Sequence, residues 1–129
     1  MVLDTSALLA LLLEEPEAEL FRIAVEDDDT RLVSAASLLE TAILIEARKG
    51  EAGGRELDLL VHKAEIAVVA VDADQVSEAR RAYRRFGKGR HAAGLNFGDV
   101  FAYALSRTSG EPLLFKGDDF AKTDVGRVV

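Results

Sequence analysis

Short apolar runs alternate with amphipathic segments along the chain, and this alternation limits the fold more than any other feature. The clearest run is residues 66–71, which is continuously apolar and rich in β-branched side chains, as in a buried parallel strand. Strands that alternate with helices predict an α/β fold, a three-layer α/β/α sandwich with a central, mostly parallel sheet. Further strands are expected at residues 2–3, 31–35, 113–115 and 125–129.

Helices are expected wherever apolar residues recur at helical spacing between these runs. Gly53 and Gly54 are expected to separate two of them, and Asp72 or Asp74 to cap another. The predicted helices cover residues 5–13, 17–26, 37–50, 56–63, 72–86 and 97–108.

The length of 129 residues predicts one domain over residues 1–129, and 49% hydrophobic residues are enough for a buried core. There is no cysteine, which excludes a disulfide framework, a zinc ribbon and a thiol nucleophile. Residues 7–13 form an apolar stretch. The residues before it include Asp4 but no Lys or Arg, and two acids follow it directly. It is therefore unlike a signal peptide, and it is shorter than the ~20 residues of a spanning helix. We expect a cytoplasmic protein with no membrane association.

Three acidic residues stand in apolar surroundings. Asp4 follows the first predicted strand, Glu40 interrupts an apolar helix, and Asp99 lies in the first turn of another. A buried carboxylate is costly unless it is paired or binds a metal. Because oxygen ligands favour magnesium or manganese over zinc, these three predict a shared Mg²⁺ or Mn²⁺ site. Each also has a structural explanation, since Asp4 can cap a helix, Glu40 can face solvent, and the helix dipole favours an acid such as Asp99.

The net charge of −7 opposes nucleic-acid binding, but the charge is unevenly distributed. Basic residues crowd residues 80–91, so a local phosphate-binding surface is possible on an acidic protein. The alternative is a solvated face or a surface for an acidic partner. The candidate RNA-binding residues are Arg80, Arg81, Arg84, Arg85, Lys88 and Arg90.

Four short motifs resemble those of PIN domains, in the same order and spacing over essentially the whole chain. They are Val2-Leu3-Asp4-Thr5-Ser6-Ala7, Ser37-Leu38-Leu39-Glu40-Thr41, Leu95-Asn96-Phe97-Gly98-Asp99-Val100, and Leu113-Leu114-Phe115-Lys116-Gly117-Asp118-Asp119-Phe120. The chain is most similar to the VapC toxins of bacterial toxin–antitoxin pairs. It departs from many PIN domains at Gly117, where they carry a fourth acid that is followed two residues later by another Asp. Asp119 matches this later position, and Asp118 is a candidate substitute for the acid that is missing at Gly117.

The resemblance implies a metal-dependent endoribonuclease that cuts selected transfer or ribosomal RNA. It also implies a homodimer that is neutralised by a VapB-type antitoxin. In such an enzyme Asp4, Glu40 and Asp99 would hold one or two divalent ions, with Asp118 or Asp119 as a possible further ligand and Ser6 orienting Asp4. The expected products carry 5′-phosphate and 3′-hydroxyl ends.

Two other functions are compatible with the sequence. A PIN scaffold could be retained only to bind RNA or a partner protein. Less favoured is a phosphohydrolase or receiver-like domain using Asp72 or Asp74 with Lys116, because it would leave Glu40 and Asp99 unexplained.

Overall fold

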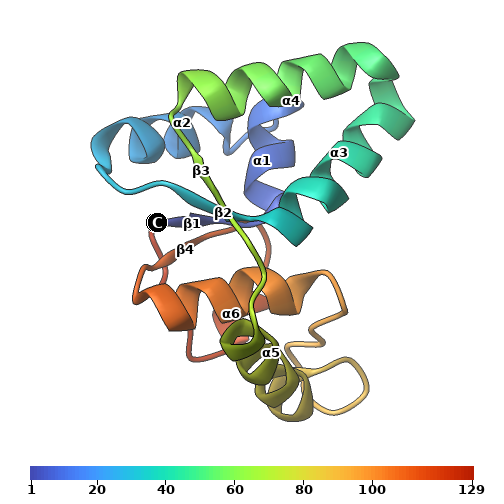
Figure 1. Cartoon of the computed structure of the whole chain (residues 1–129), viewed down its shortest axis with the longest axis vertical. Helices are drawn as coiled ribbons and strands as arrows, with labels where there is room; N and C mark the ends of the chain where they lie inside the picture. Colours follow the sequence, from blue (N-terminus) through green and yellow to red (C-terminus); the bar gives the residue numbers. More distant parts are fainter.

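The computed structural model describes residues 1–129 and has a parallel sheet between two layers of helices (Figure 1). The four strands lie in the order β3-β2-β1-β4, and every neighbouring pair is parallel. This confirms the expected α/β three-layer sandwich. The strands are short: β1 (Val2–Leu3), β2 (Leu32–Ser34), β3 (Ala67–Val69) and β4 (Leu113–Leu114).

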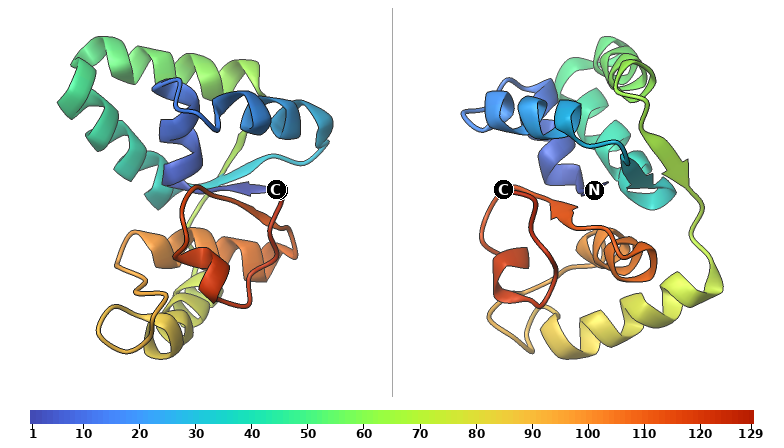
Figure 2. Two further views of the ribbon diagram at one scale, coloured as in Figure 1. Left: turned by 180° about the vertical axis from the view of Figure 1, so that it is seen from behind. Right: turned by 90° about the vertical axis from the view of Figure 1, so that its left-hand side faces the viewer.

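Four helices cover one face of the sheet and two cover the other (Figures 1 and 2). On the first face lie α1 (Thr5–Leu12), α2 (Ala18–Asp27), α3 (Ala35–Lys49) and α4 (Glu51–Lys63). The opposite face carries α5 (Ala73–Phe86) and α6 (Asp99–Ser109), and a 3₁₀ turn, η1 (Phe120–Lys122), follows β4. No helix combines the length and the hydropathy needed to cross a bilayer.

The side chains of β1 and β4 explain why both faces of the sheet need a helical layer. Successive side chains of a strand point to opposite faces. Accordingly, Val2 and Leu113 belong to the core beneath α5 and α6, whereas Leu3 and Leu114 belong to the core beneath α1 and α2. All four side chains are completely buried. Strands that are apolar on both faces are typical of a covered parallel sheet.

Two of the strands predicted from apolar runs differ in the structure. Residues 66–71 contain a parallel strand, but it is the edge strand β3, and Val68 is 47% exposed. Its prediction as a buried strand was wrong, because β3 pairs only with β2 and an apolar run does not reveal its place in the sheet. The expected strand at residues 125–129 is reduced to one bridge, between Leu113 and Arg127.

The helix boundaries follow their caps and close contacts. Ser34 caps α3 and Asp72 caps α5, so α3 begins two residues before the predicted start. Gly53 and Gly54 do not interrupt a helix but lie inside α4. A Cβ atom at Gly53 would lie 2.8 Å from the Ile45 carbonyl oxygen, so this glycine permits the close packing of α4 on α3.

Candidate carboxylate site

The order of the strands changes direction at β1. From β1 the chain moves outward through β2 and β3, and β4 then pairs on the other side of β1. In open α/β sheets such a reversal leaves a crevice at the carboxyl ends of the strands, and ligands bind there. Asp4 follows β1 and the Lys116–Asp119 loop follows β4, so both lie at this position.

Asp4 is held rigidly at the start of α1. Its side chain is buried and accepts hydrogen bonds from the Ser6 amide at 2.9 Å and the Ser6 hydroxyl at 2.6 Å. The Ser6 hydroxyl oxygen in turn accepts from the Lys116 amide at 2.9 Å. Asp4 therefore caps the helix, and Ser6 also joins it to the loop after β4. Burial raises the pKa of Asp4 to about 6; the Ser6 hydrogen bonds oppose this rise, and the charges of Asp99 and Glu40 add to it.

Glu40 projects from α3 and is fixed by a residue that the sequence did not suggest. The Thr5 hydroxyl donates to Glu40 Oε1 at 2.6 Å and lies 3.2 Å from the Ser37 carbonyl oxygen. Thr5 is buried and adjacent to Asp4. The first turn of α1 therefore positions two of the three acids, and the only sequence signal for Thr5 was its place beside Asp4.

Asp99 is positioned by a reciprocal pair of hydrogen bonds with Asn96. The Asn96 amide donates to Asp99 Oδ2 and the Asp99 amide donates to Asn96 Oδ1, each at 3.0 Å. This is the arrangement of a capping box, with Asn96 in the N-cap position and Asp99 three residues later, and the regular part of α6 begins at Asp99 itself. Burial raises the pKa of Asp99; the Asn96 bond opposes the rise, and the charges of Asp119 and Glu40 increase it.

The two candidate acids after β4 are not equivalent. Both are exposed, but the charge of Asp119 raises the pKa of Asp99, which places Asp119 within reach of the acidic cluster. Asp118 does not contribute to the pKa shift of Asp4 or Asp99. Asp4, Glu40 and Asp99 therefore influence one another electrostatically, and Asp119 joins them through Asp99.

The cluster has no basic counterpart in the protein. Asp4, Glu40, Asp99 and Asp119 form no ion pair. The nearby Lys116 ammonium instead contacts Glu15 at 2.9 Å and Glu17 at 3.2 Å. Uncompensated carboxylate oxygens at a crevice are suited chemically to a divalent cation.

The acids do not form a closed metal cage. No three acidic or histidine side chains lie close enough together to be a ready-made ligand set. Mg²⁺ usually keeps several waters and is bound through one or two carboxylates, so it does not need such a cage. The donor set therefore fits Mg²⁺ or Mn²⁺ by its charge and oxygen chemistry.

The predicted basic surface divides into two faces. All six candidate residues are exposed. Arg81 pairs with Glu78 at 2.8 Å and Arg85 with Asp124 at 3.1 Å, whereas Arg80 and Arg84 form no ion pair and border a groove between α5 and α6. The groove's other lining residues are mainly apolar: Val76, Ala79, Tyr83, Phe97, Val100 and Phe101.

Phe97 connects this groove to the acidic cluster. Its side chain is 78% exposed, and it also borders a neighbouring hollow lined by Glu40 and Gly98. Arg80 and Arg84 therefore lie along a surface that leads to the carboxylates. Lys88 and Arg90 lie in the loop between α5 and α6.

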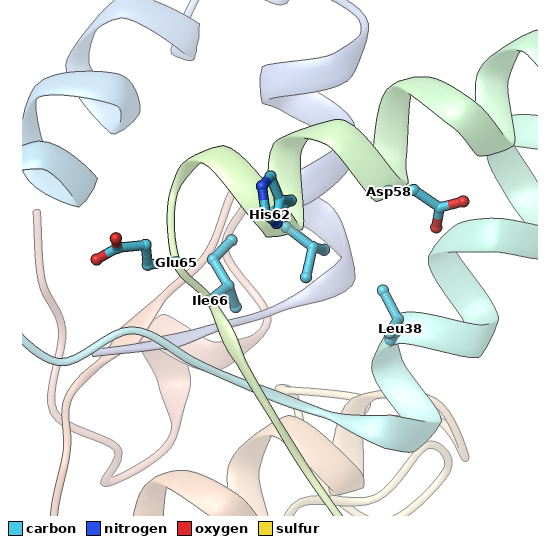
Figure 3. A pocket seen from close by; sticks show the side chains of 6 residues that line it. Leu38, Asp58, His62, Glu65 and Ile66 are labelled. Carbon is cyan, nitrogen blue, oxygen red and sulfur yellow. The ribbon is translucent and has the colours of Figure 1, made fainter.

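A separate pocket lies on the opposite layer, beside α4 (Figure 3). Its polar lining consists of Asp58, His62 and Glu65, which point in different directions and do not converge on one point. His62 is consequently not part of a metal-binding group.

Comparison with known proteins gives the family. The PIN domain profile matches residues 1–126. A protein of Mycolicibacterium smegmatis named Ribonuclease VapC is 65% identical over 128 residues, covering 99% of both chains. Ribonuclease VapC30 of Mycobacterium tuberculosis is 62% identical and covers 99% of this chain and 98% of its own.

The fold is also found in a solved structure. Mycobacterium tuberculosis VapC20, described as a sarcin-ricin loop cleaving toxin, superimposes with a TM-score of 0.78 at 20% identity, covering 96% of this chain and 95% of that chain. These matches exclude the receiver-like alternative. The chain belongs to the PIN domain family and, within it, to the VapC ribonucleases.

Proposed function

We propose that this protein is a divalent-metal-dependent endoribonuclease and the toxin of a VapBC-type pair. The observation that carries the proposal is the group of carboxylates at the sheet crevice, which lacks any basic partner. The names of relatives with 62–65% identity support cleavage of RNA. A domain retained only for binding would have no evident need for a buried Asp4 carboxylate beside two other acids.

In this proposal Asp4, Glu40 and Asp99 hold one or two divalent ions, partly through metal-bound water, and Asp119 is favoured over Asp118 as the additional ligand. When bound, Mg²⁺ or Mn²⁺ would offset charge on the scissile phosphate and make water a better nucleophile. Ser6 and Thr5 orient the carboxylates through hydrogen bonds, and Asn96 holds Asp99. The chain offers no serine–histidine pair at this site, so the carboxylates are its reactive groups.

The groove beside α5 supports a role in holding RNA. Arg80 and Arg84 are free to contact phosphates, while Tyr83, Phe97 and Phe101 offer aromatic surface next to them. Single-stranded RNA is commonly bound by this combination of cations and aromatic rings. Such phosphate contacts would position the substrate without reading its sequence.

We also propose a homodimer and a VapB-type antitoxin as protein partners. The supporting observation is an apolar surface on α3 and before α6, where Leu39 is 62%, Ile43 59% and Phe97 78% exposed. Contiguous exposed apolar side chains usually mark an interaction surface. We assign the α3 part of this surface to contact with a second copy of the chain.

The enzymatic proposal is tested with purified, antitoxin-free protein and total RNA. We expect discrete fragments with 5′-phosphate ends when Mg²⁺ or Mn²⁺ is present and none with EDTA. Asp99→Asn should abolish cleavage while remaining folded, because it removes a ligand charge but keeps the hydrogen bonds to Asn96. Asp58→Asn on α4 is a matched control that should cleave normally. Cleavage by a folded Asp99→Asn protein, or undiminished cleavage in EDTA, would contradict the proposal.

A further inference from the structure

Gly98 lies immediately before Asp99 and directly against the carboxylate of Glu40. A Cβ atom placed on Gly98 would lie 2.1 Å from Glu40 Oε2, 2.8 Å from Cδ and 2.9 Å from Oε1. All three distances are shorter than real Cβ contacts allow. The space that a side chain would need at position 98 is therefore occupied by the carboxylate.

The backbone itself does not require glycine at this position. Gly98 has φ −67° and ψ −37°, which is the right-handed helical conformation that any residue adopts. By contrast, Gly110, at the other end of α6, has φ +75°. Alanine is favoured over glycine in helical backbone, so local stability argues against the glycine found here.

Glu40 is also restrained from the other side. The Thr5 hydroxyl donates to Oε1 at 2.6 Å, and Thr5 is itself buried on α1. The carboxylate thus lies between a fixed hydroxyl and the bare Cα of Gly98. A methyl group at position 98 would meet only the end of the flexible Glu40 side chain, so the fold can tolerate it, but Glu40 would have to leave this position.

We propose that Gly98 is a positioning residue for the metal site: its missing side chain lets the Glu40 carboxylate lie beside Asp99. This rests on the proposed metal-dependent function. Gly98 touches neither the cation nor the RNA in this account. Its contribution is to leave the space beside Asp99 that the Glu40 carboxylate occupies.

The test compares Gly98→Ala with Gly126→Ala in the full chain. Gly126 is a matched control, because a Cβ atom there would lie an ordinary 3.7 Å from Pro112. Mn²⁺ binding is measured by isothermal titration, and stability by urea unfolding in EDTA. We expect Gly98→Ala to be at least as stable as the parent but to bind Mn²⁺ at least about tenfold more weakly, which is the usual scale for disturbing a residue that orients a metal ligand. Gly126→Ala should match the parent in Mn²⁺ affinity.

A second substitution examines the geometric reason. Glu40→Asp shortens the side chain by one methylene, which makes room for a methyl group at position 98. Introduced into Gly98→Ala, it should recover part of the lost Mn²⁺ affinity, although Glu40→Asp alone should weaken binding. Recovery of this kind is not expected if the Gly98→Ala substitution merely disturbed folding.

The outcomes separate the two proposals. Parent-like Mn²⁺ affinity of Gly98→Ala, or a loss of urea stability showing that the backbone needs glycine, would overturn the role of Gly98 while leaving the metal-dependent function standing. An absence of Mn²⁺ binding and of metal-dependent cleavage in the parent protein would overturn both.

Discussion

The charged side chain of Asp4 lowers the stability of the folded protein. It is buried next to two other acids, and only the hydrogen bonds from Ser6 compensate. Its pKa rises from 3.8 to about 6, so the native state binds a proton more tightly than the unfolded chain does. Stability from this group is therefore present below pH 3.8 and is lost as the pH rises to about 6. At neutral pH the loss is of the order of 3 kcal/mol.

Asp4→Asn should consequently stabilise the metal-free protein above pH 7 by roughly 1–3 kcal/mol, because asparagine also caps a helix and carries no charge. The gain should disappear near pH 4, where Asp4 is protonated. Urea unfolding in EDTA at both pH values measures it. A destabilised Asp4→Asn protein at pH 8 would show that the carboxylate is compensated in a way that the structure does not reveal.

At the scale of elements, helix α5 separates its four arginines into two pairs with different surroundings. Arg80 and Arg84 border the apolar groove without an ion pair, whereas Arg81 and Arg85 are neutralised by Glu78 and Asp124. Because residues four apart share a helical face, Arg80 lies beside Arg84 and Arg81 beside Arg85. Only the packing against α6 and the C-terminal segment shows which pair borders the groove without an ion-pair partner.

Replacing both Arg80 and Arg84 with alanine should weaken RNA binding. It should also reduce the magnitude of the slope of log affinity against log salt concentration by about 1.4, because each lost phosphate contact to single-stranded RNA reduces this slope by about 0.7. The Arg81→Ala, Arg85→Ala double variant is the matched control, with the same change of charge on the other face. Binding is measured by fluorescence anisotropy over a salt series, with a labelled single-stranded RNA and an Asp99→Asn background to prevent cleavage. Equal effects of the two pairs would assign the salt dependence to net charge alone and not to the groove.

At the scale of the whole molecule, helix α3 leaves part of its apolar surface uncovered. Ile45 is completely buried beneath α4, but Leu39 and Ile43 remain more than half exposed. The monomer has too few elements to cover every side of this helix, since α4 packs on one side and α1 on another. A second copy of the chain would bury what remains.

Ile43→Asp should therefore convert a dimer into a monomer, because a charge at a buried apolar contact costs more than the contact contributes. Light scattering after size-exclusion chromatography gives the mass, and thermal unfolding controls for folding. Ile23→Asp on α2, where the side chain is 48% exposed, is the matched control and should leave the dimer intact. A parent protein that remains monomeric at high concentration, or a dimer that survives Ile43→Asp, would contradict the proposed contact.

Much of this architecture was predictable because it depends on local patterns. Alternating apolar runs predicted the parallel α/β sandwich, and the position of Asp4 after a strand predicted its place at the crevice. Glu40 and Asp99 could be selected from sequence because a carboxylate in an apolar segment is unusual. Asn96 could have been recognised too, since an N-x-x-D spacing before a helix resembles a capping box.

Other properties depended on contacts between segments that are distant in sequence, and only the tertiary structure decided them. The exposure of β3 follows from its place at the sheet edge, and the continuity of α4 through Gly53 follows from its packing on α3. The tertiary structure also decides that Asp119, and not Asp118, raises the pKa of Asp99. The sequence alone determined which residues are unusual; the fold determined which of them meet, because charge repulsion and close packing act between neighbours in space.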